Sequence, residues 1–277
     1  MDRLLDVPPG HVRKLPCRGG LAESVHVFDE EALDAVEAAH AARRPLLVRG
    51  EPGTGKSQLA RAVAEVAGRA FLFKTVDGRT EARDLFYRFD AVARLAEAQI
   101  QGSLRNATEE AIRERLKESR FLQPGVLWWA FHRAGAEKQA KVACLSSPIA
   151  ADAGEGSVVL IDEIDKADSS VPNGLLEALG SATFEVPGQD ERIPMEGEPL
   201  VIVATNEERA LPDAFLRRCM VLQLELPAAT DELIEFLVER GREHVDRALG
   251  EDVLIRTAEQ LDEDRRKAKA AGLSPPG

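Results

Sequence analysis

The sequence predicts an α/β fold in which a parallel sheet of five strands is covered by helices on both faces. Five short, continuously apolar segments have the composition of strands that are buried on both sides, and segments with helical spacing lie between them. Strands that alternate with helices favour a parallel sheet, because each helix returns the chain to the edge where the previous strand began. The predicted strands are residues 45–48, 70–75, 157–162, 200–204 and 220–224.

The composition excludes several classes of protein. The 277 residues are 44% hydrophobic and 30% charged, which suffices to bury a core and excludes wholesale disorder. The net charge of −12 argues against a broad electrostatic grip on nucleic acid or on an anionic membrane, although it is compatible with a local basic patch. No apolar run approaches the roughly 20 residues of a membrane span. The first residues do not resemble a signal peptide, and the three scattered cysteines form neither a metal-ligand spacing nor a disulfide framework. We therefore expect a soluble, cytoplasmic protein.

The first elements are predicted in order along the chain. Residues 1–23 contain two Pro/Gly clusters and are expected to be irregular. A helix over 28–42 follows, with Asp29 as its N-cap. The first strand leads through a glycine-rich turn into a helix over 56–67, which Gly68 closes before the second strand.

The middle of the chain is less regular. Asn106 and Glu109 form a capping pair that predicts a charged helix to about Ser119, and a further helix is expected over 125–140. Trp128 and Trp129 in that helix offer a partner-binding surface or a part of the core. We expect core residues, because large aromatic side chains dominate burial energies.

The second half of the chain again alternates strands and helices. Pro187-Gly188 lies between two short extended segments and predicts a hairpin. After the fifth strand only helical signals remain, with Thr230 as an expected N-cap and a second helix from Glu251. The other elements expected here are the helix over 173–179, the hairpin segments 183–186 and 192–195, and the third to fifth strands.

A glycine-rich motif follows the first strand directly and matches the phosphate-binding pattern G-x-x-x-x-G-K-[ST]. Glycines let several backbone N–H groups point inward at phosphate oxygens, and the following helix adds the positive end of its dipole. Lys56 is expected to contact the β- and γ-phosphates and Ser57 to bind Mg²⁺. A glycine-rich turn with a solvated lysine is the alternative, and the flanking strand and helix disfavour it. The motif is Gly50-Glu51-Pro52-Gly53-Thr54-Gly55-Lys56-Ser57.

Polar residues follow the third and fourth predicted strands, and two arginines precede the fifth. Asp162 and Glu163 end the third strand, where Asp162 is expected to hold Mg²⁺ and Glu163 to polarise an attacking water molecule. Asn206 follows the fourth strand and either positions that water molecule or forms a turn. Arg217 and Arg218 precede the fifth strand, where an arginine can stabilise the charge of a transferring phosphoryl group or simply face solvent.

In this order, the four elements resemble Walker A, Walker B, sensor 1 and the arginine-finger region of AAA+ ATPases. The amino-acid sequence is most similar to the MoxR-like and dynein-related bacterial branch in four segments, residues 45–53, 162–167, 175–179 and 211–215. The resemblance covers about residues 24–228 and implies a P-loop NTPase fold with strand order 5-1-4-3-2. It further implies ATP and Mg²⁺ as ligands and a homo-oligomeric ring in which an arginine finger acts in trans. Arg218 occupies the usual place of that finger and is favoured over Arg217.

The same resemblance defines the domain organisation. An irregular segment, 1–23, precedes the nucleotide-binding core, 24–228, and a partial helical lid, 229–277, follows it. More chain separates Lys56 from Asp162 than the roughly 30 residues of a strand–helix–strand unit, which indicates an insertion in helix 2 at about 81–130.

The lid departs from the family pattern. A complete lid carries an arginine, sensor 2, that contacts the nucleotide. Arg265 and Arg266 lie in a charged stretch and are interpreted as a solvated face, and Pro276 stands near the place of the expected arginine. No sensor 2 is therefore assigned. Val25 and Val27 lie where related proteins contact the base.

Three functional hypotheses follow. The leading one is an ATPase that couples hydrolysis to the remodelling or maturation of an unidentified protein client, as MoxR-like proteins are thought to do. A nucleotide-gated assembly scaffold with little turnover is the alternative that the short lid suggests. A McrB-like motor subunit is a third, which the acidic composition and the lack of a recognisable DNA-reading module disfavour.

Overall fold

Five parallel strands form the central sheet, in the order β11-β3-β10-β7-β4. Numbered along the chain, these strands have the order 5-1-4-3-2, which confirms the predicted topology. Their bounds are β3 Leu46–Gly50, β4 Ala70–Thr75, β7 Ser157–Asp162, β10 Leu200–Thr205 and β11 Met220–Leu224. The structure is a computed structural model that describes residues 3–18, 20–103, 108–187, 192–245, 250–273 and 275–276.

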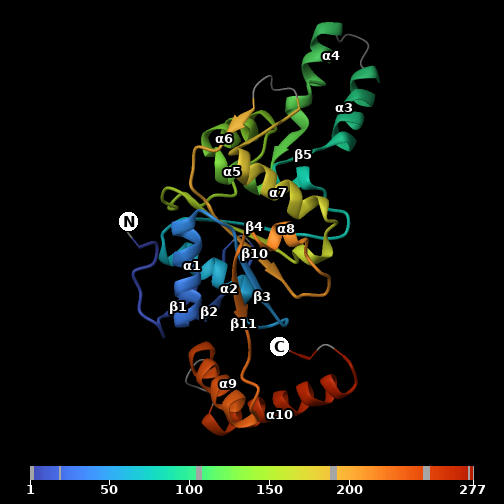
Figure 1. Cartoon of the computed structure of the whole chain (residues 1–277). Helices are drawn as coiled ribbons and strands as arrows, with labels where there is room; N and C mark the ends of the chain where they lie inside the picture. Colours follow the sequence, from blue (N-terminus) through green and yellow to red (C-terminus); the bar gives the residue numbers. More distant parts are fainter. Residues whose placement is uncertain are drawn as a thin grey trace.

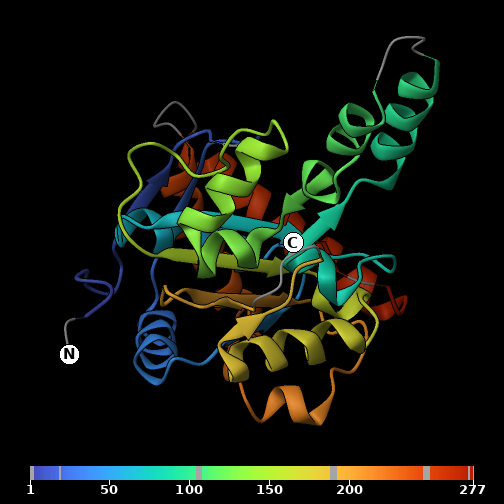
Figure 2. The same ribbon diagram turned by 90° about the horizontal axis from the view of Figure 1, so that it is seen from above.

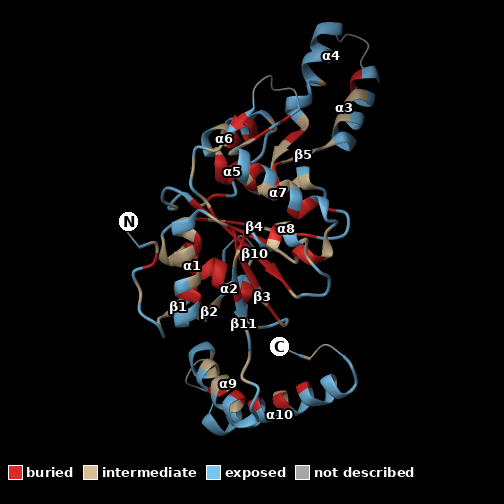
Figure 3. Ribbon diagram, in the orientation of Figure 1, coloured by how far each residue is buried: buried red, intermediate tan, exposed pale blue. Residues whose placement is uncertain are grey.

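Helices cover the sheet on both faces (Figure 1). One face packs on α1 (Glu30–Ala42) and α2 (Lys56–Val66), and the other packs on α5–α8. Successive strand residues alternate between the two cores, because side chains of a strand point to opposite faces in turn. The central strands are accordingly buried throughout, as Figure 3 shows. The second group comprises α5 Val126–Phe131, α6 Arg133–Val142, α7 Ser170–Ser181 and α8 Asp213–Leu216.

The N-terminal segment is more regular than the sequence suggested. Strands β1 (Val12–Leu15) and β2 (Ser24–Val27) pair antiparallel and pack against α2. The expectation of an irregular segment over 1–23 was wrong here, because the Pro/Gly clusters flank β1 rather than replace it. Leu15 is fully buried and joins the core of the α1/α2 face. Asp29 lies at the expected N-cap position of α1.

The segment expected as an insertion forms an arm that projects from the core (Figures 1 and 2). An antiparallel pair, β5 with β6, makes its base and the helices α3 and α4 make its shaft. Thr108 caps α4, its hydroxyl accepting a hydrogen bond from the Ala111 amide at 3.3 Å, and α4 ends at Arg115 instead of near Ser119. Asn106 lies outside the described residues. The arm consists of η1 Ala82–Leu85, β5 Tyr87–Phe89, α3 Ala91–Ser103, α4 Glu109–Arg115, η2 Glu118–Phe121 and β6 Leu122–Pro124.

A break divides the helix expected over 125–140 into α5 and α6. The backbone of His132 is extended at φ −144°, and its Nδ1 accepts a hydrogen bond from the Gly135 amide at 2.8 Å, which caps α6. Ahead of the break, Trp128 and Trp129 are buried, so the expectation that they are core residues is confirmed.

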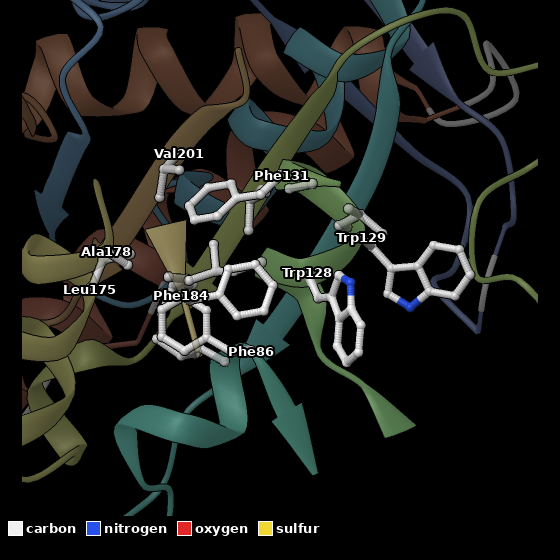
Figure 4. Close-up of a cluster of buried hydrophobic side chains, with 14 of the residues drawn as sticks. Phe86, Trp128, Trp129, Phe131, Leu175, Ala178, Phe184 and Val201 are labelled. Carbon is white, nitrogen blue, oxygen red and sulfur yellow. The ribbon is translucent and has the colours of Figure 1, made fainter. Parts of the chain in front are cut away.

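An aromatic cluster joins α5 to the hairpin β8–β9 (Figure 4). The ring of Phe184 lies 5.8 Å from Trp128 and 5.2 Å from Phe86, between centroids. The hairpin strands β8 (Thr183–Phe184) and β9 (Ile193–Pro194) pair antiparallel as predicted, and Gly188 of the predicted turn lies outside the described residues. The preceding helix, α7, runs through Gly180 rather than ending there.

The two C-terminal helices, α9 (Thr230–His244) and α10 (Glu251–Ala270), lie below the core in Figure 1, and we call this helix pair the lid. Arg240 attaches α9 to β2, since its guanidinium donates to the Val27 carbonyl at 2.8 Å and pairs with Asp29. Next to this contact, the ring of His26 packs edge-on against Phe28. None of the helices described is both long enough and apolar enough to cross a bilayer.

We expect Phe184→Ala to lower the free energy of unfolding by about 3–5 kcal/mol, because it opens a cavity among buried aromatic rings. Phe73→Ala makes the same chemical change at a side chain that is 42% exposed and should cost about 1 kcal/mol or less. Urea denaturation of both variants measures the difference. Equal losses would contradict the burial assigned to Phe184.

The free energy of unfolding is expected to depend on pH through His26, at the junction of lid and core. Burial, with added repulsion from Arg240 and His244, lowers the pKa of His26 to about 4 from 6.5. Between these values the unfolded chain binds a proton that the folded chain does not, so stability falls as the pH drops, by about 3 kcal/mol in all. Urea denaturation between pH 7 and pH 4 should show this loss in wild type and a smaller loss in His26→Gln. An unchanged pH profile in the variant would assign the loss to other groups.

Candidate functional site

The glycine-rich motif forms the loop between β3 and α2, at the carboxyl end of the sheet. A side chain at Gly50 would meet the Leu224 carbonyl of β11 at 2.5 Å, so only glycine fits this close approach. Gly55 has φ +91° and lies at the N-cap of α2, a conformation that glycine adopts without steric cost. The loop therefore directs the N-terminus of an eleven-residue helix at the space above it.

Lys56 lies inside the curve of this loop. Its ammonium group donates hydrogen bonds to the carbonyls of Gly50 and Glu51, each at 2.8 Å, and the residue is only 6% exposed. Burial lowers the pKa of Lys56, while nearby carboxylates, first among them Asp162, oppose that shift. The lysine is thus positioned by the backbone that would hold the phosphates.

Ser57 and Asp162 come together although 105 residues separate them. The Ser57 hydroxyl donates to the Asp162 carboxylate at 2.5 Å, and the second oxygen of this carboxylate accepts the Glu163 amide at 2.9 Å. A hydroxyl and a carboxylate are oxygen ligands, which Mg²⁺ prefers. The residues predicted to hold the ion therefore fit it in chemistry and in place.

Glu163 has a left-handed backbone, with φ +60°, in the turn that leads into η3 (Ile164–Lys166). Its carboxylate pairs with Lys166 at 2.8 Å, and this hydrogen bond raises the pKa of Lys166. Both side chains remain partly exposed, so the pair is accessible to solvent from the loop side. Glu163, the expected base, therefore lies beside the glycine-rich loop and is held by one cation.

Asn206 follows β10, which lies between β3 and β7 in the sheet. The turn after it is fixed by two hydrogen bonds: the Glu207 amide donates to Thr205, and the Glu208 amide donates to the Asp165 carboxylate at 3.1 Å. Asp165 is 2% exposed, and its other oxygen has no partner among the described residues. Sequence analysis gave Asp165 no role, although its place three residues after Asp162 could have drawn attention to it.

One cavity of about 370 Å³ collects most of the predicted residues. Those that do not line it are Gly50, Glu51 and Thr54 of the loop and Arg218. Its lining is Pro52, Gly53, Gly55, Lys56, Ser57, Gln58, Asp162, Glu163 and Asn206.

Arg217 and Arg218 lie at the opposite end of the sheet. Both are exposed and precede β11, whose first residue pairs with the first residue of β3 while Leu224 pairs with Gly50. A strand of five residues separates the two ends by roughly 17 Å. Arg44 donates to the carbonyls of both residues and fixes this corner. Neither arginine can therefore reach the cavity of its own chain.

Arg265 contradicts the interpretation drawn from the sequence. It was interpreted as part of a solvated face, but it is 4% exposed and its guanidinium contacts the carboxylate of Glu51 in the glycine-rich loop. Lys269 reaches the same carboxylate at 3.4 Å. The buried residues of α10 are Ala258, Asp262 and Arg265, and this spacing of four and three was the signal for an inward face.

Helix α10 of the lid thus contacts the glycine-rich loop through ion pairs with Glu51. Burial alone raises the pKa of Glu51, but the hydrogen bond and charge of Arg265, together with Lys269, outweigh burial and hold this pKa below its usual value. Glu51 therefore stays ionised at neutral pH, and the ion pair persists there.

Comparison with known proteins relates the chain to one family and to two solved structures of low similarity. A family model of the AAA domain, dynein-related subfamily, matches residues 45–219. No curated protein sequence matches the chain. A candidate ATPase from Cytophaga hutchinsonii is 13% identical with a TM-score of 0.44, and the match covers 85% of this chain and 63% of that one. A RuvB mutant from Thermotoga maritima is 16% identical with a TM-score of 0.45, over 90% of this chain and 64% of that one. The chain spans less than two thirds of the length of either.

We expect Arg265→Ala to lower the free energy of unfolding by about 2 kcal/mol, because it leaves Glu51 without its main partner in a partly exposed setting. Lys269→Ala removes the longer and more exposed contact and should cost less than about 0.5 kcal/mol. Urea denaturation at neutral pH measures both. A double-mutant cycle with Glu51→Ala that gave no coupling to Arg265 would rule out the ion pair as the source.

Proposed function

The chain belongs to the dynein-related subfamily of AAA domains, and from this we propose that it binds ATP in the loop 50–57 and hydrolyses it. The observation that carries the proposal is the convergence of Lys56, Ser57 and Asp162 at one cavity. Backbone amides, an ammonium group and a helix N-terminus are suited to a triphosphate.

Each residue of the loop has a definite task in this proposal. The backbone N–H groups of Glu51 and of residues 53–57 bind the phosphate oxygens, while Pro52 has no N–H to offer, and Gly50 and Gly55 permit the curve that directs these groups inward. Lys56 exchanges its two carbonyl partners for phosphate oxygens, which requires only a rotation of its side chain. Pro52, Gly53 and Thr54 complete the loop, and Thr54 stiffens it by donating to the Glu51 carbonyl at 2.9 Å.

Ser57 and Asp162 would hold Mg²⁺, Ser57 directly and Asp162 through water. When bound, the ion would neutralise charge on the β- and γ-phosphates. In this structure the two side chains that would hold it are hydrogen-bonded to each other at 2.5 Å.

Glu163 and Asn206 act on the attacking water molecule. We assign Glu163 as the residue that accepts its proton or polarises it, and Asn206 as the residue that orients it. Lys166 holds the Glu163 carboxylate in this structure, so this carboxylate must turn from Lys166 to reach the water molecule.

Arg218 is assigned as an arginine finger that acts on a neighbouring copy. The support is its exposed position at the end of the sheet that faces away from its own cavity. A head-to-tail contact that repeats this arrangement closes into a ring if the rotation permits. Activity is then a property of the assembly rather than of one chain.

Coupling of hydrolysis to the remodelling or maturation of a protein client is the biological role that we propose. Two features support it: the amino-acid sequence of the motifs is similar to that of MoxR-like proteins, and an arm projects from the core where a client can reach it (Figure 2). A nucleotide-gated scaffold is the second candidate, which the Arg265–Glu51 ion pair favours because it links lid position to the nucleotide loop.

Phosphate release at concentrations that allow assembly tests the ATPase. We expect Glu163→Gln to lower the rate of phosphate release by about 100-fold or more while ATP binding is retained. The variant loses only the carboxylate that polarises the attacking water molecule or accepts its proton. Lys56→Ala should lose ATP binding itself. Calorimetry with Mg²⁺ and a non-hydrolysable analogue separates the two effects, and equal turnover in wild type and Glu163→Gln would contradict the assignment.

Mixing inactive variants tests the finger. Arg218→Ala keeps an intact site and Lys56→Ala keeps an intact finger, so their mixture should regain part of the activity that each lacks alone. Arg217→Ala is the matched control and should retain most of its activity. If turnover is negligible but an ATP analogue still drives assembly by light scattering, the scaffold replaces the ATPase.

A further inference from the structure

Strand β4 lies at an edge of the central sheet and pairs only with β7. The amides of Ala70 and Val76 donate toward β7, and strand geometry alternates these directions along the chain. The amides and carbonyls of Phe71, Phe73 and Thr75 therefore face outward. Within the described part of the chain, no backbone or side-chain group is hydrogen-bonded to them. An edge of this kind is a template for a further strand.

A cavity of about 840 Å³ runs along this edge, and we name it the β4 trough. Its floor is residues 69–74, and its walls come from the loop 147–153, the base of the arm at 123–126, and the start of the arm at 79–88. It shares no lining residue with the cavity of the phosphate loop. The trough is thus a second, separate concave site.

The trough offers apolar contacts as well as a free backbone edge. Phe71 and Phe73 stack with ring centroids 6.0 Å apart, and Phe73 is 42% exposed. Trp129 also lines the trough, and Figure 4 places its ring on the far side of Trp128 from Phe184. Trp129 is only 5% exposed, so the exposed ring of Phe73, with the half-buried ring of Phe71 beside it, offers the apolar contact for side chains of an added segment.

The charge of the trough is opposite to that of the chain. Its lining includes Arg79 and Arg88, both exposed, whose side chains make no ion pair or hydrogen bond within the described residues. Lys74 lines it as well. In a chain of net charge −12, free cations gathered at one site favour an acidic partner.

The acids of the trough do not balance its cations, because six lysine and arginine residues line it against three carboxylates, which leaves a net charge of +3. The three carboxylates also have local partners. Glu65 pairs with Arg13 and Arg18. Asp77 accepts hydrogen bonds from the Arg79 amide and from Thr80, and Asp84 accepts one from the Glu81 amide.

We propose that the β4 trough binds an extended, acidic peptide segment of a partner protein, which adds to the outer edge of β4 as a sixth strand. The outward amides and carbonyls supply the main-chain hydrogen bonds, Phe71 and Phe73 contact alternate side chains, and Arg79 and Arg88 pair with carboxylates. The proposal does not depend on the nucleotide site. A helix does not fit, because its own backbone groups are already paired.

Selection from a phage-displayed library of ten-residue peptides is the first test. Peptides that bind should be enriched in Asp and Glu over Lys and Arg and should lack proline at alternate positions. A fluorescein-labelled binder then gives a dissociation constant by anisotropy. A library that yields no binder, or binders without acidic preference, overturns the proposal.

Four variants locate the binding. Arg79→Glu and Arg88→Glu should each weaken it at least tenfold, whereas Arg113→Glu on the exposed arm should not change it. Phe73→Pro removes an outward amide without touching the ladder to β7, and Phe73→Ala removes the ring alone. Phe73→Pro should therefore bind at least tenfold more weakly than Phe73→Ala. Circular dichroism and urea midpoints verify that each variant is folded.

Amide exchange distinguishes an added strand from other modes of binding. The peptide should slow exchange at Phe71, Phe73 and Thr75, while the amides of alternate residues are already protected by β7. Protection of the same amides by self-assembly alone would assign the trough to a second copy of this chain. Binding of an oligothymidylate without amide protection would assign it to nucleic acid. Both results overturn the proposal, and unchanged peptide binding by Lys56→Ala separates it from the ATPase.

Discussion

The hydrogen bond between Ser57 and Asp162 is the contact on which the site depends. It joins the loop after β3 to the end of β7, two strands that are not neighbours, since β10 lies between them. The order of the strands therefore decides the chemistry: β10 brings Asn206 between the other two ends. Because all three strands are parallel, their carboxyl ends meet at one edge, where ligands of open sheets bind.

The parts of this site that the sequence predicted are those in which one short segment determines the local structure. The glycine pattern of 50–57 and the apolar strand before Asp162 need no distant partner to be recognised. The burial of Arg265 was not predicted because it depends on which face of α10 turns inward, and that face carries polar residues. Strand β1 was not predicted because its four residues, between Pro/Gly clusters, are too few to show a clear alternation of polar and apolar residues.

Net charge illustrates the same limit. A value of −12 describes the whole surface and argues against a broad electrostatic grip on nucleic acid or on an anionic membrane. Arg79 and Arg88 nevertheless line one trough, and they do so only because β4 and the base of the arm lie together in the fold. Their sequence neighbours include acids, and only the structure shows that cations outnumber acids along the trough. A local cationic site in an acidic chain is thus a tertiary property that composition conceals.

Two arginines of the lid connect it to different parts of the core. Arg240 of α9 donates to the Val27 carbonyl beside the N-terminal hairpin, and Arg265 of α10 contacts Glu51 in the phosphate loop. The first anchor is remote from the loop and the second belongs to it. A displacement of Glu51 therefore either breaks an ion pair with a buried guanidinium or moves α10 with it, while α9 stays attached through Arg240. Because Glu51 contacts α10 through an ion pair, a shift of the glycine-rich loop is coupled to α10 by charge, whereas α9 is held at a different point of the core.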